Sequence, residues 1–133
     1  MLEVAGIDHI VLRTDKLELM LGFYRDVLGC EIERESAEIG LTQLRAGDAL
    51  IDLVDVNSYL GRIGGGPPSE LENNVDHFCL QLKSISEAQI RTYLTSKGVE
   101  VGEFGERYGA QGKGQSVYIK DPQGNTVELR SRI

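Results

Sequence analysis

The first half of the chain contains four short segments rich in apolar residues and one longer segment with a helical period. The four short segments are typical of strands. Between the first and the second of them, apolar residues from Leu17 to Leu28 recur every three or four positions, which is typical of one face of a helix. Gly29 should end this helix. The predicted strands are residues 7–12, 30–34, 41–45 and 49–54.

The second half of the chain repeats the same order. Val75-Asp76-His77-Phe78-Cys79-Leu80 matches Ile7-Asp8-His9-Ile10-Val11-Leu12 at an offset of 77 − 9 = 68. A capping box from Ser84 to Glu87 should start a helix whose apolar stripe includes Tyr93, and Gly98 should end it. The further predicted strands are residues 99–101, 115–120 and 125–130. An internal repeat of this kind indicates two similar modules.

The two halves are separated by Gly64-Gly65-Gly66-Pro67-Pro68, a sequence that favours neither helix nor central strand. We therefore expect one domain, residues 1–133, with a first βαβββ repeat at about 5–56, a linker at about 57–73 and a second repeat at about 74–131. The predicted fold class is α+β. Each helix covers one sheet face, so the two uncovered faces should form a curled mixed sheet around a cleft. A lid is the alternative role for the glycine-rich linker.

Four polar residues lie at related positions in the two modules. His9 is equivalent to His77, Asp52 is equivalent to Glu128, and the chain has no other histidine. Alternation places each of the four opposite its apolar strand neighbours. Taken singly, each is explained by an ordinary hydrogen-bonded histidine or solvated carboxylate. Taken together, two imidazoles and one or two carboxylates suit a divalent metal ion of borderline softness.

Four motifs carry a resemblance to a known family. They are Gly6–His9, Phe23–Gly29, Val75–His77 and Tyr118–Leu129. In these motifs the sequence resembles the vicinal oxygen chelate superfamily, which includes glyoxalase I, fosfomycin-resistance enzymes and extradiol dioxygenases. The resemblance covers nearly the whole chain. It implies a single glyoxalase-like domain of paired βαβββ modules, with a divalent metal in the cleft.

The resemblance also implies roles for individual residues. By position, the metal ligands would be His9, His77 and Glu128. Asp52 matches the place where glyoxalase I has a glutamate that serves as fourth ligand and proton-transfer group. Aspartate is shorter by one C–C bond, roughly 1.5 Å. Asp52 is therefore expected either as a metal ligand or as a catalytic base, with Glu128 as the other catalytic carboxylate.

The segment Arg107–Gly114 is rich in glycine and is expected to be a loop near the substrate. Its glycines would permit close approach to a ligand. Arg107 and Lys113 could hold a carboxylate or phosphonate, and Tyr108 lies between them in sequence. The alternative is a solvated turn with no ligand.

Together these features predict a glyoxalase-like lyase or isomerase that acts on a small substrate with vicinal oxygens. Its ion would be Zn, Ni, Mn, Co or Fe, and glutathione or another thiol could be a co-substrate. The first alternative is a fosfomycin-type thiol transferase or hydrolase. An extradiol-type dioxygenase is the second, although 133 residues is short for one. The third is a drug-binding module, whose bleomycin-binding examples lack the metal ligands.

Charge and composition narrow the choice of partners. The net charge of −7 argues against nucleic acid, which needs clustered Lys and Arg. The sequence shows no signal peptide and no apolar stretch long enough for a membrane span, so a cytoplasmic location is expected. Cys30 and Cys79 have no metal or redox spacing and are expected to be buried thiols. A homodimer is expected, because two-fold pairs are the commonest assembly.

Overall fold

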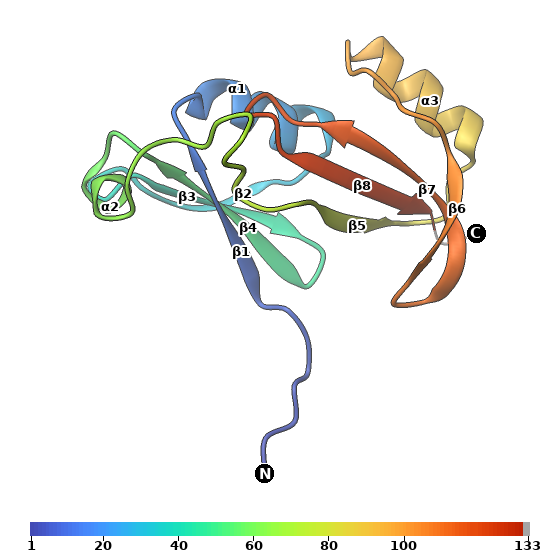
Figure 1. Ribbon diagram of the computed structural model, residues 1–133, viewed down its shortest axis with the longest axis horizontal. Coiled ribbons are helices and arrows are strands. Elements are labelled where there is room, and N and C mark those ends of the chain that lie inside the picture. Colours follow the sequence, from blue (N-terminus) through green and yellow to red (C-terminus); the bar gives the residue numbers. More distant parts are fainter. Residues whose placement is uncertain (132–133) are drawn as a thin grey trace. The chain divides into compact units, whose positions relative to one another are not determined.

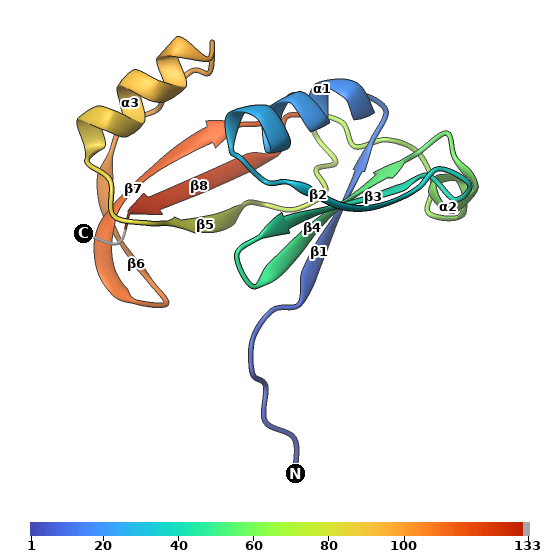
Figure 2. The ribbon, with the colours of Figure 1, turned by 180° about the vertical axis from the view of Figure 1, so that it is seen from behind.

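The computed structural model describes residues 1–131, which fall into two compact units (Figures 1 and 2). The first unit is Met1–Asn74, and the second begins at Val75. Each has the βαβββ order and one four-stranded mixed sheet. The predicted α+β class and the two repeated modules are thereby confirmed.

The first unit builds its sheet from the strands β1 to β4 in the order β1-β4-β3-β2. β1 runs parallel to β4, and the other neighbours are antiparallel. One face carries the nearly inaccessible side chains of Leu12, Leu44, Ile51 and Leu53. The strands are β1 (His9–Thr14), β2 (Ile32–Ser36), β3 (Leu41–Ala46) and β4 (Ala49–Asp55).

The helix of the first unit changes its period part of the way along. It starts as an α-helix, α1 (Leu17–Leu21), and continues as a π-helical segment, η1 (Gly22–Val27). The amide of Leu28 donates to the carbonyl of Phe23 at 3.0 Å, a five-residue step. Gly29 then adopts a φ of 77°, so the predicted end of the helix is confirmed.

The second unit repeats the arrangement, with its strands in the order β5-β8-β7-β6 (Figure 1). β5 runs parallel to β8. The helix α3 (Glu87–Ser96) buries Ile90 and Leu94 but leaves Tyr93 43% exposed, so Tyr93 does not belong to the buried stripe. The strands are β5 (Phe78–Leu82), β6 (Gly105–Gly109), β7 (Gly112–Lys120) and β8 (Thr126–Ser131).

The register of the parallel strand pairs agrees with the sequence repeat. Val11 on β1 is opposite Asp52 on β4, and Cys79 on β5 is opposite Glu128 on β8. Cys79 and Val11 are related by the same offset of 68 residues that relates His77 to His9. The equivalence of Asp52 and Glu128 therefore holds at the level of the backbone hydrogen bonds.

Three local predictions are wrong. Residues 99–101 form no strand. The segment 107–114, expected as a loop, forms the turn of the β6–β7 hairpin at Ala110 and Gln111 together with the adjoining three residues of each strand. The capping box uses Ser86 and Gln89, two residues later than predicted. Propensity alone could not reveal the hairpin, because four of the ten residues from 105 to 114 are glycine, which is depleted in strands.

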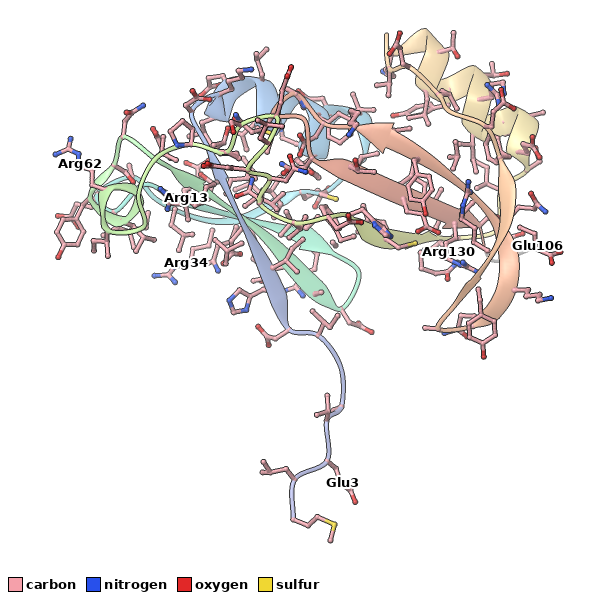
Figure 3. All side chains as sticks on the ribbon, in the orientation of Figure 1. Glu3, Arg13, Arg34, Arg62, Glu106 and Arg130 are labelled. Atoms are coloured by element: carbon pink, nitrogen blue, oxygen red, sulfur yellow. The ribbon has the colours of Figure 1, made fainter. Side chains whose placement is uncertain are left out.

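The segment predicted as a linker contains a short helix, α2 (Tyr59–Ile63), whose N-cap is Ser58. The side chain of Arg13 on β1 binds α2 and the glycines that follow this helix (Figure 3). Its guanidinium donates to the carbonyls of Gly61 at 2.7 Å and Gly66 at 3.3 Å, and also to that of Gly65. The glycine-rich part of the predicted linker is therefore bound to the sheet of the first unit. Among residues 1–131, no helix has the length and hydropathy needed to cross a bilayer.

Candidate functional site

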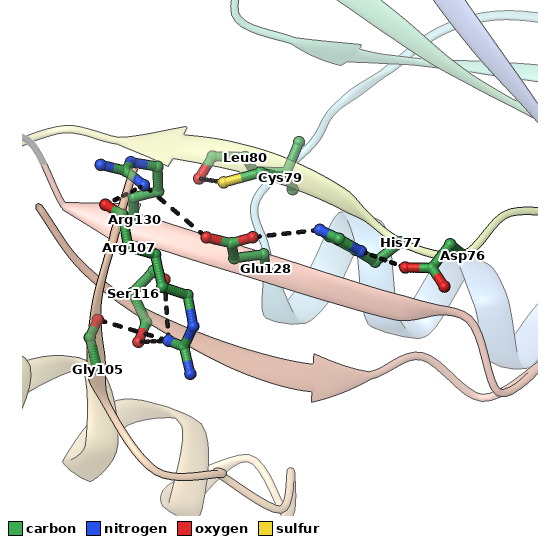
Figure 4. A network of polar contacts seen from close by, with 9 residues as sticks. All are labelled: Asp76, His77, Cys79, Leu80, Gly105, Arg107, Ser116, Glu128 and Arg130. Atoms are coloured by element: carbon green, nitrogen blue, oxygen red, sulfur yellow. Dashed lines mark hydrogen bonds and ion pairs between the residues drawn. The ribbon is translucent and has the colours of Figure 1, made fainter. Parts of the chain in front are cut away.

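Each unit brings one histidine and one carboxylate together on the sheet face away from its apolar core. In the first unit, β1 begins at His9 and the neighbouring β4 carries Asp52. His9 Nε2 lies 4.0 Å from Asp52 Oδ2. In the second unit, His77 directly precedes β5, and its Nε2 lies 3.4 Å from Glu128 Oε1 on β8 (Figure 4).

The two histidines are oriented in the same way by the residue before each of them. The Nδ1 atom of His9 is 2.7 Å from Asp8 Oδ1, and that of His77 is 2.6 Å from Asp76 Oδ2. This contact fixes the ring so that Nε2 points to the paired carboxylate. The hydrogen bond that His9 donates to Asp8, followed by the negative charge of Asp52, raises the pKa of His9. Sequence reasoning missed both aspartates, although the repeated Asp-His dipeptide was a visible signal.

The two carboxylates are buried, but they have different partners. Asp52 is 3% exposed, and the side-chain amide of Gln43 on β3 donates to both of its oxygens at 3.2 Å. Glu128 is 6% exposed. Its Oε2 atom lies 3.9 Å from Nη1 of Arg130, which is an ion pair rather than a hydrogen bond (Figure 4).

The predicted substrate-binding residues lie on two different faces of the second sheet. Arg107 on β6 shares the face of Glu128. Its Nη1 atom donates to the carbonyl of Ser116 at 2.6 Å and to the hydroxyl at 3.0 Å (Figure 4). Its guanidinium carbon lies 4.5 Å from the ring centroid of Tyr118. Alternation turns Tyr108 to the opposite face, where it is 81% exposed.

Lys113 lies opposite Tyr108 in the β6–β7 pair. Its Nζ atom is 3.8 Å from Glu106, which also points to that opposite face (Figure 3). Of the three residues, only Arg107 therefore lies on the same face as the His77–Glu128 pair.

Cys79 belongs to the face of Glu128, and contrary to the sequence-based expectation it is exposed, whereas Cys30 is buried. Partial burial of the thiol, with a smaller effect from Glu128, raises the pKa of Cys79 to about 11. At neutral pH it is therefore a neutral thiol rather than a thiolate.

Imidazole nitrogen and carboxylate oxygen are both donors that borderline divalent ions accept. Each unit offers one such pair, and no three or more His, Cys, Asp or Glu side chains in residues 1–131 form a group that could hold a metal ion. The donor types thus fit a metal, and one pair alone supplies two ligands.

The sequence matches one family model along nearly its whole length. Residues 6–129 match the model of the Glyoxalase/Bleomycin resistance protein/Dioxygenase superfamily. No curated protein matches the chain.

Several solved structures share the fold. An integron cassette protein from the mobile metagenome of V. cholerae is 24% identical, with a TM-score of 0.76 over 100% of this chain and 99% of that one. A virulence protein from Salmonella typhimurium is 24% identical, with a TM-score of 0.76 over 99% and 100%. Lactoylglutathione lyase from Agrobacterium tumefaciens is 24% identical, with a TM-score of 0.70 over 97% and 95%.

Proposed function

Because the chain belongs to the glyoxalase/bleomycin resistance protein/dioxygenase superfamily, we propose that it is a divalent-metal-dependent lyase or isomerase of glyoxalase type. Its substrate would be a small molecule with two neighbouring oxygens. The observation that carries the proposal is the repeated arrangement of an aspartate, a histidine and a buried carboxylate, Asp8–His9–Asp52 in one unit and Asp76–His77–Glu128 in the other.

The residues that would hold the ion are His9, His77 and Glu128. An aspartate on the far nitrogen of each histidine is the usual outer partner of a metal-binding imidazole, because it fixes the ring and makes Nε2 a better donor. His9 belongs to the first unit, and His77 and Glu128 belong to the second. Binding of one ion by all three would therefore require donors from both units, taken from one chain or from two chains of a dimer. When bound, the ion would act as a Lewis acid toward the oxygens of the substrate.

Asp52 is the residue that we assign to proton transfer. Gln43 donates to both of its oxygens through a neutral amide, so the carboxylate is held in place without an arginine or lysine partner from residues 1–131. A carboxylate so held can accept a proton from a substrate carbon and return it to the neighbouring one. Arg107 would bind an anionic group of the substrate, since within residues 1–131 Nη1 is the only guanidinium nitrogen of Arg107 that forms a hydrogen bond.

Metal binding is the first test. The chelator-stripped protein should bind one equivalent of Ni²⁺ or Zn²⁺, measured by titration and elemental analysis. His9→Ala, His77→Ala and Glu128→Ala should each weaken binding, and Asp52→Asn should weaken it less. Asp48→Ala, in an exposed turn, is the matched control. Metal binding unchanged in all three alanine variants would overturn the assignment.

Turnover is the second test. The metal-loaded protein would be offered hemithioacetals of methylglyoxal, fosfomycin with several thiols including glutathione, and catechols with Fe²⁺. Isomerisation of a hemithioacetal that is lost in Asp52→Asn, with the metal retained, supports the proposal. Turnover of fosfomycin alone, or oxygen uptake with a catechol, would replace it with the transferase or the dioxygenase alternative. Tight binding of a drug without metal would indicate a binding module.

We also propose a homodimer, since small domains of this kind can complete a site by pairing, and two-fold pairs are the commonest assembly. Sedimentation at low micromolar concentration measures this directly. A monomer that retains full activity would refute the idea of a site shared between chains.

A further inference from the structure

We propose that Arg130 is a positioning residue for Glu128: its guanidinium, fixed against the β6–β7 hairpin, holds one carboxylate oxygen so that the other faces His77. The inference rests on the proposed function, because it concerns the carboxylate that would bind the metal. It deepens that function by adding a residue that touches neither metal nor substrate.

The guanidinium of Arg130 is held firmly. Arg130 is 6% exposed, and its Nη2 atom donates to the carbonyl of Gly112 at 2.8 Å, while Nη1 donates to the carbonyl of Arg107 at 3.2 Å (Figure 4). A buried cation needs such partners. Nη1 also faces Glu128 Oε2 at 3.9 Å, so a cation tied to the hairpin backbone lies beside the carboxylate.

Two glycines make room for this guanidinium. A Cβ atom at Gly109 would lie 2.8 Å from Nη1 of Arg130, and one at Gly114 would lie 2.9 Å from Nη2. From the sequence, the glycines of this segment are expected to permit the approach of a ligand. At these two positions the group that approaches is the side chain of Arg130.

Within residues 1–131, no arginine or lysine forms an ion pair with the equivalent carboxylate in the first unit. Both oxygens of Asp52 accept from the neutral amide of Gln43. The oxygens of Glu128 are instead divided, with Oε1 facing His77 and Oε2 facing Arg130. A carboxylate whose two oxygens have separate partners presents one defined oxygen toward the histidine, which is what a monodentate metal ligand requires.

Two effects of removing Arg130 have opposite signs, and this makes the test decisive. Loss of a positive charge beside a cation site would by itself strengthen metal binding. Loss of the positioning contact weakens it, and outer-sphere changes of this type cost about 10–100-fold in metal affinity. We expect the second effect to dominate in Arg130→Met.

The probe is Co²⁺ added to chelator-stripped protein, with affinity measured by calorimetry and geometry by the visible absorption of the bound ion. Arg130→Met should bind Co²⁺ about 10–100-fold more weakly and with an altered spectrum, and Arg130→Lys should recover part of the affinity. Arg91→Met is the matched control, because Arg91 also donates to a backbone carbonyl, that of Gly102, but lies on α3. Its affinity should not change.

Gly114→Ala tests the same idea without removing the arginine. The added methyl meets only the far end of a flexible side chain, so the fold should survive while the guanidinium is displaced. Weaker Co²⁺ binding in this variant and in Arg130→Met, at unchanged circular dichroism, supports the inference. Unchanged or tighter binding in either folded variant overturns it. If Glu128→Gln itself leaves Co²⁺ binding unchanged, the proposed function fails instead.

Discussion

Replacement of Asp121 by alanine should destabilise the second unit strongly. Asp121 lies between β7 and β8 and is 4% exposed. Its Oδ1 atom accepts from the amides of Gln123 and Asn125, both at 2.9 Å, and its Oδ2 atom accepts from the side-chain amide of Asn125 at 2.8 Å. The carboxylate thus fixes the turn that sets the register of β8.

The magnitude follows from the three donors that lose this acceptor. The two on Asn125 are buried and cost about 1.5 kcal/mol each when they lose a partner, and the part-buried amide of Gln123 costs about 1 kcal/mol. We therefore expect Asp121→Ala to lower the free energy of unfolding by about 4 kcal/mol, a large part of a typical domain's stability. Asp121→Asn keeps one acceptor oxygen and should lose about half as much.

Urea denaturation followed by far-ultraviolet circular dichroism measures the change. Asp48→Ala provides the control, since Asp48 occupies the exposed β3–β4 turn. A loss below about 1 kcal/mol in Asp121→Ala would refute the reasoning, because it would mean that water or neighbouring groups replace the carboxylate without cost.

Three further changes have defined outcomes. Gly61→Ala should cost about 3 kcal/mol in urea denaturation, because its Cβ would lie 2.0 Å from the backbone oxygen of Asp55, and an unchanged midpoint would contradict this. Arg13→Met should speed amide hydrogen exchange across residues 61–66 about 10-fold, since the bonds from its guanidinium are lost; equal exchange rates would exclude that role. In metal-free protein at pH 8, a pKa raised from 9.0 to about 11 lowers the thiolate fraction of Cys79 about 100-fold. The less acidic thiol gives a thiolate that is about 8-fold more nucleophilic. Iodoacetamide should therefore react about 10-fold more slowly with Cys79 than with an ordinary thiol. A rate equal to that of a free thiol would show that the local environment has no such effect.

The repeat made most of the fold predictable from sequence. A match of six residues at an offset of 68 was sufficient to align the modules, and the strand orders and parallel registers agree with it. The pairing of each histidine with one carboxylate inside its own unit also follows, since alternation puts His9 and Asp52 on one face of adjacent strands.

The remaining features depend on long-range packing that no local pattern encodes. The β6 strand consists of Gly-Glu-Arg-Tyr-Gly and is held by pairing with β7 rather than by its own propensity. The role of Arg130 depends on the backbone of that hairpin, which comes together with β8 only in the folded sheet. Alternation along β8 puts Arg130 on the face of Glu128, but it carries no information on what surrounds the guanidinium.

The close fit of Arg130 between Gly109 and Gly114 has an evolutionary consequence. Each of these glycines is constrained by a residue at least 130 − 114 = 16 positions away in the chain, and the constraint disappears if that residue becomes small. In a lineage that loses the arginine, both glycines are free to acquire side chains. Once they have done so, the arginine cannot return without clashes. Substitutions at the three positions should therefore be inherited as a set, and their order of appearance should be difficult to reverse.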